Sequence, residues 1–430
     1  MAPMRPVKAI AMKMTSLFVS AIIAVLLAIP ASAQPVDPKV MARIDRILKK
    51  TPLIDGHNDL PEALRENYKL SVEGLASGGA ERGKPLMTDM ARLHQGRVGG
   101  QFWSVYIDGE IKGDEAIRTT LEQMDTVDRL IRAYPNDLER AFTADDMVRA
   151  HRAGRIGSLM GVEGGRQIGG SMAALRQFYR LGARYMTLTH NQTTEWADSA
   201  TDDPKFDGLS PFGLEVVKEM NRLGMLVDLS HVSPATMKDA IAASKAPVIF
   251  SHSDVSALNP HPRTVADEVL RLLPANGGVI MLTFVPSFLT DAGWAWGRER
   301  LAEEARLKSL YSYDSKRQEA ELKNWEAAHP MPPVRVSDVA DHIEHAARIA
   351  GHDHVGIGGD LDGITQTVTG LGGVEQYPNL FAELIRRGWS DENLAKLAGG
   401  NILRVLRRAE AVAASMKDVP PSMATLDSVK

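Results

Sequence analysis

Residues 224–253 read GMLVDLSHVSPATMKDAIAASKAPVIFSHS. Two short apolar runs, 224–231 and 246–253, flank the stretch 233–244, which begins with a Ser-Pro helix start signal. A strand, a helix and a second strand at this spacing predict a parallel sheet, because a parallel connection has to cross back over the sheet, usually through a helix. Both runs carry a Ser-His pair at their ends, and the carboxyl ends of parallel strands meet at one edge of the sheet.

The same unit recurs along the chain, with helical stretches such as 115–135, 171–182 and 211–224 between the apolar runs. Eight such units predict a closed (β/α)8 barrel of the TIM type, whose carboxyl-terminal strand ends form one mouth. Residue types that bind metals cluster at these ends, so we expect an α/β barrel of the metal-dependent hydrolase type. The eight runs are PLIDGHND (52–59), GGQFWSVYI (99–107), GSLMGVEGG (157–165), ARYMTLTH (183–190), GMLVDLSH (224–231), APVIFSHS (246–253), GGVIMLTF (277–284) and DHVGIGGDLDG (353–363).

The body of the chain predicts one domain. Its 430 residues are 44% apolar and 24% charged, which are values typical of globular proteins, and no break in composition divides residues 34–410. A charge-rich helical insertion, about 286–335, separates the seventh run from the eighth. Because it leaves the carboxyl end of a strand, the insertion starts near the mouth; a lid, a dimer contact and a solvated hairpin all remain open. We expect the tail, 411–430, to be flexible.

Residues 1–33 have the pattern of a secretory signal peptide. Arg5, Lys8 and Lys13 precede the apolar run LFVSAIIAVLLAI, and residues 31–33 (Ala-Ser-Ala) supply the small residues of a cleavage site. An uncleaved anchor is the alternative. The chain has no cysteine, and its formal charge of −4 offers no basic surface for nucleic acid. We therefore expect a periplasmic or secreted protein without disulfides, nucleic-acid partners or a stable membrane anchor after cleavage.

Five residues at the ends of these runs are candidate metal ligands. His57 and Asp59 are two residues apart, so on a strand their side chains point to the same side. Glu163 has no basic neighbour in the sequence, and a buried carboxylate requires a cationic partner, for which a metal ion would serve. His231 and His252 end consecutive strands that should lie about 4.8 Å apart, so both imidazoles can reach one ion.

Four further residues at the mouth are candidates for catalysis or substrate binding. His190 suits either a metal ligand or a hydrogen-bond donor toward a reacting carbonyl. Asp360 and Asp362, expected to share one face of the last strand, could each be a ligand or a general base. Arg263 matches a substrate carboxylate, although an arginine in a loop more often forms a salt bridge.

Together these segments resemble the membrane (renal-type) dipeptidase family of metallopeptidases. The resemblance runs from about residue 50 to residue 410. The motifs that carry it are DGHNDLP (55–61), GGQFWSVY (99–106), GVEGG (161–165), LTHN (188–191), DLSHV (228–232), SHS (251–253), PRTVADEVL (262–270), SDVADHIEH (337–345), GIGGDLDG (356–363) and LAGGNILRVL (397–406).

The resemblance implies a site with two Zn²⁺ ions in a (β/α)8 barrel. Carried over position by position, His57 and Asp59 would hold one zinc ion, and His231 and His252 would hold the other. Glu163 would bridge both ions.

The resemblance also assigns roles to residues around the metals. His190 would donate to the scissile carbonyl oxygen, Arg263 would hold the C-terminal carboxylate of the substrate, and Asp360 would transfer the proton. Tyr106, at the end of the second run, would contact the substrate.

The function implied is hydrolysis of free dipeptides, with tolerance of a D-residue at the C-terminal position. The alternatives are another amidohydrolase activity, on a lactone, a β-lactam or a cyclic amide, or a non-catalytic periplasmic binding or maturation protein. The family further suggests a homodimer. The chain lacks the cysteines and the anchor tail of the animal members, which fits an exported bacterial relative. The sequence leaves open the preferred side chains, the metal used in the cell, the oligomeric state and the role of the insertion.

Overall fold

The computed structural model describes residues 36–428. The predicted signal peptide, residues 1–33, lies outside the described residues. Among the helices that are described, none is both long enough and apolar enough to span a membrane.

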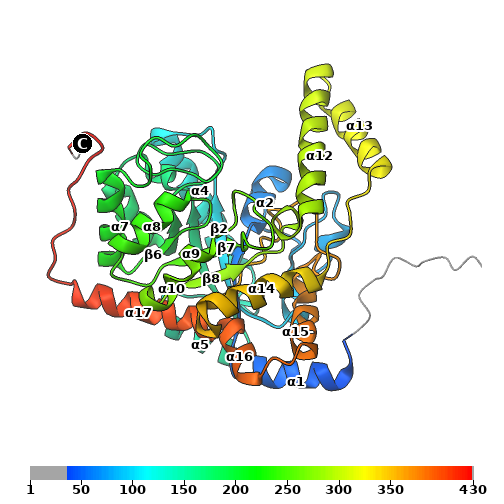
Figure 1. Ribbon diagram of the computed structural model, residues 1–430, viewed down its shortest axis with the longest axis horizontal. Helices are drawn as coiled ribbons and strands as arrows, with labels where there is room; N and C mark the ends of the chain where they lie inside the picture. Colours follow the sequence, from blue (N-terminus) through cyan, green and yellow to red (C-terminus); the bar gives the residue numbers. More distant parts are fainter. Residues whose placement is uncertain (1–35, 429–430) are drawn as a thin grey trace, which may run out of the picture. The chain divides into compact units, whose positions relative to one another are not determined.

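The strands form one parallel sheet that closes into a barrel (Figure 1). Neighbouring strands follow the order β2-β1-β9-β8-β7-β6-β5-β4, and pairing of β2 with β4 closes the ring of eight. A ninth strand, β3, pairs only with β4 and lies outside the ring. The predicted (β/α)8 barrel is therefore confirmed. The strands are β1 (Leu53–Asn58), β2 (Val98–Tyr106), β3 (Leu138–Arg140), β4 (Ile156–Glu163), β5 (Ala183–Thr187), β6 (Leu226–Asp228), β7 (Ile249–Ser253), β8 (Val279–Leu282) and β9 (Val355–Ile357).

Helices cover the outside of the ring, and their ends follow the sequence signals. In α8 (Pro234–Ala243), the Ser233 side chain accepts a hydrogen bond from the backbone of Thr236, and proline occupies the first turn. The other α-helices are α1 (Pro38–Leu48), α2 (Leu60–Tyr68), α3 (Met90–Gln95), α4 (Gly113–Ala133), α5 (Ala144–Arg152), α6 (Met172–Leu181), α7 (Pro211–Leu223), α9 (Asp267–Leu270), α10 (Leu273–Asn276), α11 (Pro286–Leu289), α12 (Asp291–Leu310), α13 (Ser315–Ala328), α14 (Val336–Ala350), α15 (Tyr377–Arg386), α16 (Asp391–Ala395) and α17 (Asn401–Ser415).

The core has two parts. The larger cluster packs the outer helices against the outside of the barrel. The smaller cluster includes one or more residues from most strands of the ring, together with apolar residues of α5 and α17. These strand residues are Ile54, Phe102, Leu159, Tyr185, Leu226, Ile249, Val279 and Met281.

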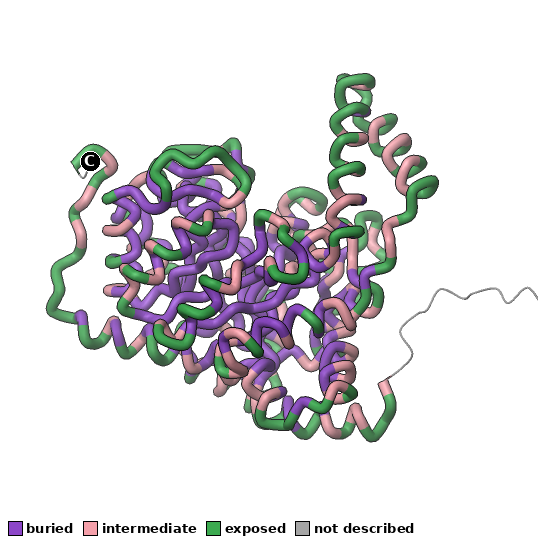
Figure 2. Tube along the Cα trace, viewed as in Figure 1, coloured by how far each residue is buried: buried purple, intermediate pink, exposed green. Residues whose placement is uncertain are grey.

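The insertion lies between β8 and β9, as predicted. Helices α12 and α13 form a hairpin that extends away from the barrel (Figure 1), and most of it is exposed (Figure 2). Within the described residues α13 has no buried side chain, whereas Trp296 of α12 is buried and donates its indole N–H to the His329 carbonyl at 2.6 Å. This bond joins the start of α12 to the end of α13 at the base of the hairpin, while the far end of the hairpin is exposed.

The last helix crosses the boundary expected at residue 410, because α17 continues to Ser415. Beyond it, the Ser422 backbone N–H donates to the Glu219 carboxylate at 3.2 Å, and Arg176 donates to the Ser422 carbonyl at 2.9 Å. The flexibility of the tail stays a prediction.

Candidate metal centre

Every predicted metal ligand lies at the carboxyl-terminal mouth of the barrel. His57 and His252 belong to strands β1 and β7, and Glu163 is the last residue of β4. Asp59 directly precedes α2, and His231 follows β6. All five side chains are buried. The structure therefore brings together the residues that the sequence singled out.

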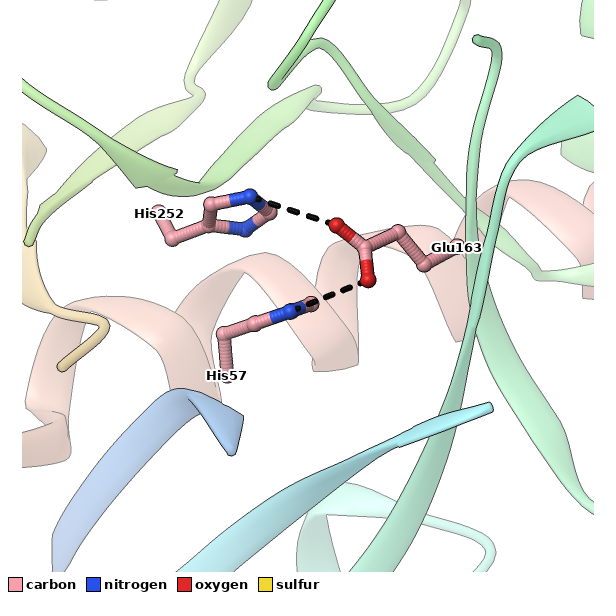
Figure 3. A group of neighbouring side chains, drawn as sticks. All are labelled: His57, Glu163 and His252. Atoms are coloured by element: carbon pink, nitrogen blue, oxygen red, sulfur yellow. Dashed lines mark ion pairs between the residues drawn. The ribbon is translucent and has the colours of Figure 1, made fainter. Parts of the chain in front are cut away.

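The Glu163 carboxylate lies between two groups of ligands. One of its oxygens, Oε2, is 3.3 Å from His57 Nε2. The other, Oε1, is 3.0 Å from His231 Nε2 and 3.5 Å from His252 Nε2 (Figure 3 shows Glu163 between His57 and His252). A carboxylate with one oxygen directed to each group has the geometry needed to bridge two cations.

The two groups differ in their chemistry. In the first, His57 Nε2 is 3.2 Å from Asp59 Oδ2 and 3.9 Å from Asp360 Oδ1. In the second, the Nε2 atoms of His231 and His252 are only 3.0 Å apart. Both sets of donors, imidazole nitrogen and carboxylate oxygen, are those that bind zinc and other divalent transition metals.

The protonation of the second group fits a metal. Burial is the main cause that lowers the pKa of His231 and of His252 well below the usual value, so both imidazoles are neutral at pH 7. Two neutral nitrogens that face each other have lone pairs to share with a cation. Within residues 36–428, two buried atoms of the first group, His57 Nε2 and Asp59 Oδ1, have no hydrogen-bond partner. A bound metal would satisfy these atoms.

Residues behind the ligands orient them. The Ser251 hydroxyl donates to Asp228 Oδ2 at 2.6 Å, so it accepts from His252 Nδ1 at 2.9 Å. This assignment leaves His252 Nε2 unprotonated and directed at the cluster. His57 Nδ1 is likewise held by the Tyr185 hydroxyl at 2.8 Å. These supporting roles could not be predicted from the sequence, because serine, aspartate and tyrosine inside a strand are equally compatible with simple packing.

His190 lies at the edge of the second group, and its ligand atom is within 4.8 Å of those of Glu163 and His231. Its Nε2 is 3.8 Å from Glu163 Oε1, and its ring packs against Tyr106 and His231 with centroid separations of 4.5 Å and 4.2 Å. Burial, and next the charge of Arg263, lowers the pKa of His190 well below the usual value. A neutral imidazole at this place can donate a hydrogen bond to a substrate.

Arg263 is a buried cation whose hydrogen-bonding capacity is largely unused. Within the described residues its Nε and Nη2 atoms have no partner, and its guanidinium lies over the Phe288 ring at 5.1 Å. Burial lowers its pKa to about 10, so it remains charged at neutral pH. An unpaired guanidinium inside a cavity matches a carboxylate ligand.

Asp360 faces the first group, but its neighbour Asp362 does not. The expectation that the two share one strand face is wrong, because β9 ends at Ile357 and both aspartates follow it in left-handed conformations with φ of 62° and 68°. Asp362 Oδ1 accepts instead from the Met87 backbone N–H at 2.7 Å. Burial raises the pKa of Asp360 well above its usual value, although the His57 charge opposes this.

The ligands line a cavity of about 290 Å³. Arg263, His190, Tyr106 and Asp360 line it as well, so all the predicted site residues except His57 and Asp362 surround one space. Sequence reasoning did not single out six other lining residues. Two of them lie next to predicted residues, since Glu62 is in the first turn after Asp59 and Asn191 follows His190. The six are Glu62, Asn191, Val285, Phe288, Gly363 and Ile364.

An eight-stranded barrel with buried histidines and carboxylates at its mouth defines the class of metal-dependent hydrolases. A family model described as membrane dipeptidase (peptidase family M19) matches residues 41–419. The chain therefore belongs to the membrane dipeptidase family and is a metallodipeptidase, as the sequence predicted.

Similar proteins agree with this assignment. The dipeptidase verJ of Clonostachys rogersoniana is 40% identical over 389 residues, which cover 88% of this chain and 89% of verJ. Among solved structures, the probable dipeptidase PvdM of Pseudomonas aeruginosa is 23% identical with a TM-score of 0.72, covering 87% of this chain and 99% of that one. A metallo peptidase of Rhodobacter sphaeroides, liganded with a phosphinate mimic of L-Ala-D-Ala, is 23% identical with a TM-score of 0.69, covering 84% and 99%. These structures share the fold.

Proposed function

We propose that this metallodipeptidase is a dinuclear zinc enzyme that cleaves free dipeptides and tolerates a D-residue at the C-terminal position. The proposal rests on the position of the Glu163 carboxylate between the two groups. One of its oxygens lies 3.3 Å from His57, and the other lies 3.0 Å from His231. The phosphinate mimic of L-Ala-D-Ala bound to the Rhodobacter sphaeroides protein supports the D-tolerance.

In this proposal His57 and Asp59 hold one ion, His231 and His252 hold the other, and Glu163 is shared. When bound, such ions lower the pKa of water toward neutrality and polarise a carbonyl group. Zinc is favoured by the donor set of imidazole nitrogens and carboxylate oxygens.

The protein's own residues then bind and orient the substrate. Arg263 pairs with the terminal carboxylate of the substrate. Because the Arg263 side chain is buried, its position sets the distance between this carboxylate and the scissile bond, which favours dipeptides over longer peptides. His190 donates an N–H to the scissile carbonyl oxygen and stabilises the charge that develops there. Tyr106, packed on the His190 ring, forms the adjoining wall.

Asp360 is the proton carrier of the proposal. Its carboxylate lines the cavity and lies 3.9 Å from His57 Nε2, so it is next to the site where water would be activated. It accepts the proton of the attacking water and returns it to the leaving amine, so that the amide C–N bond breaks and a free amine and carboxylate form.

We also propose that the protein is exported, on the basis of the signal-peptide pattern in residues 1–33. The homodimer stays a prediction from the family.

The test compares hydrolysis of L-Ala-D-Ala, L-Ala-L-Ala and N-acetyl-L-Ala-D-Ala before chelation, after chelation and after return of zinc. Cleavage of the two free dipeptides that is lost on chelation and restored by zinc is the expected result. The N-acetyl substrate reports whether a free amine is needed. A folded protein that carries about two zinc ions and cleaves none of these substrates would contradict the proposal and direct the search to lactones and cyclic amides.

A further inference from the structure

A second cavity adjoins the metal cavity. It has a volume of about 300 Å³ and shares Val285, Gly363 and Ile364 with the metal cavity. Its far wall is the first three turns of α12, the helix that starts the insertion. We call this space the annex and define it by His261, Val285, Trp294, Gly297, Met331 and Ile364.

A row of rings leads from Arg263 into the annex. Phe288 packs against the Arg263 guanidinium at 5.1 Å and against the His261 ring at 4.5 Å. The His261 ring in turn lies 5.1 Å from the ring of Trp294. Burial, and next the charge of Arg263, lowers the pKa of His261 to about 4. At neutral pH the three rings of this wall are therefore uncharged, while the Arg298 guanidinium lies over the Trp294 ring at 4.9 Å.

The two arginines that line the annex are paired or exposed. Arg300 pairs with Glu326 at 2.6 Å and with Glu304 at 3.2 Å. The Trp296 indole N–H is satisfied by a backbone carbonyl, and Arg298 is exposed. What the annex offers a ligand is thus mainly aromatic and aliphatic surface, which favours an apolar group.

We infer that the annex binds a large apolar or aromatic side chain on the C-terminal residue of the dipeptide, and that the base of α12 is a specificity element. The inference rests on the proposed function, which pairs the substrate carboxylate with Arg263. Since Phe288 contacts both Arg263 and His261, the residue that carries this carboxylate is the one whose side chain reaches the annex.

Gly297 provides the sharpest test because it faces open space in the annex. A Cβ atom added there would meet a single heavy atom within 4 Å, the Ser287 Cβ at 3.7 Å, which is ordinary contact. Gly297→Phe should fill the annex without disturbing the barrel, and replacing a glycine inside a helix does not cost helix stability. Ala302→Phe, at an exposed position of the same helix, is the matched control. Trp294→Ala removes part of the wall and is a second, independent variant.

The experiment measures kcat/KM of the zinc-loaded enzymes for L-Ala-L-Phe, L-Phe-L-Ala and L-Ala-L-Ala. We expect the ratio of Ala-Phe to Ala-Ala to fall about tenfold in Gly297→Phe and in Trp294→Ala, in the range that loss of an apolar pocket gives. The ratio of Phe-Ala to Ala-Ala should stay within twofold, and Ala302→Phe should change neither ratio.

Binding provides a readout that does not depend on turnover. Calorimetry with phosphinate analogues of Ala-Phe and Ala-Ala should show a Kd for the first that rises about tenfold in Gly297→Phe, while the second changes much less. If the variants hydrolyse all three dipeptides with unchanged kcat/KM ratios, or if only the Phe-Ala ratio changes, the annex does not bind the C-terminal side chain. The proposed function would not be affected by this result. Failure of the wild-type enzyme to cleave Ala-Ala would overturn the proposed function and this inference with it.

Discussion

Replacing Glu163 with glutamine should lower the stability of the zinc-loaded protein much more than that of the metal-free protein. The substitution keeps the shape of the side chain but removes the charge that lies within 3.8 Å of four imidazoles. In the metal-free protein we expect a small change, because His57 keeps Asp59 at 3.2 Å as an ionic partner. In the zinc-loaded protein both ions lose a shared ligand.

The loss of stability can be calculated from the linkage between zinc binding and folding. If each ion binds about 100-fold more weakly, each contributes about 2.7 kcal/mol less to the free energy of unfolding. Two ions together account for about 5 kcal/mol. At roughly 2.1 cal/mol/K per residue, a chain of 430 residues has an unfolding entropy of about 0.9 kcal/mol/K, so Tm should fall by about 6 °C.

The assay is thermal unfolding of wild type and Glu163→Gln after chelation and again at a fixed zinc concentration. Glu62→Gln is the matched control, since Glu62 lines the same cavity and the structure places it in neither ligand group. We expect the zinc-dependent rise in Tm to be kept in Glu62→Gln and largely lost in Glu163→Gln. An equal rise in Glu163→Gln and wild type would refute the shared role of this carboxylate.

Three further substitutions test individual residues. Asp360→Asn should keep its metal content by elemental analysis and lose turnover about 10³-fold, because the proton carrier is gone; near wild-type turnover would eliminate this role. Arg263→Met should raise KM for free dipeptides about 100-fold while affecting their C-terminal amides little, and an unchanged KM would show that the carboxylate binds elsewhere. Tyr185→Phe removes the 2.8 Å hydrogen bond to His57 Nδ1 and should weaken metal binding 10- to 100-fold in a chelator competition; undiminished affinity would mean that packing alone orients His57.

The sequence predicted the ring of strands and the ligands for one physical reason. Buried parallel strands are continuous apolar runs, so the polar residues at their carboxyl ends, such as His252 and Glu163, stand out in the sequence. Strand β3 was not predicted, since it has only three residues and pairs with a single neighbour outside the ring.

Other features depend on contacts between distant segments. Tyr185 lies in an ordinary apolar strand, and nothing in its local sequence indicates that its hydroxyl holds His57, 128 residues away. Asp362 was misplaced because two-residue alternation applies only within a strand, and the chain has already left β9. The ring of Phe288 belongs to the insertion, whose packing beside Arg263 becomes visible only in the folded chain.

The dinuclear site can be tested by titrating the chelated protein with zinc while bound metal and hydrolysis of L-Ala-D-Ala are measured together. We expect metal binding to saturate at about two ions per chain and activity to reach its maximum at the same point. Hydrolysis that persists in the metal-free protein, or a folded protein that binds no zinc, would contradict the dinuclear site.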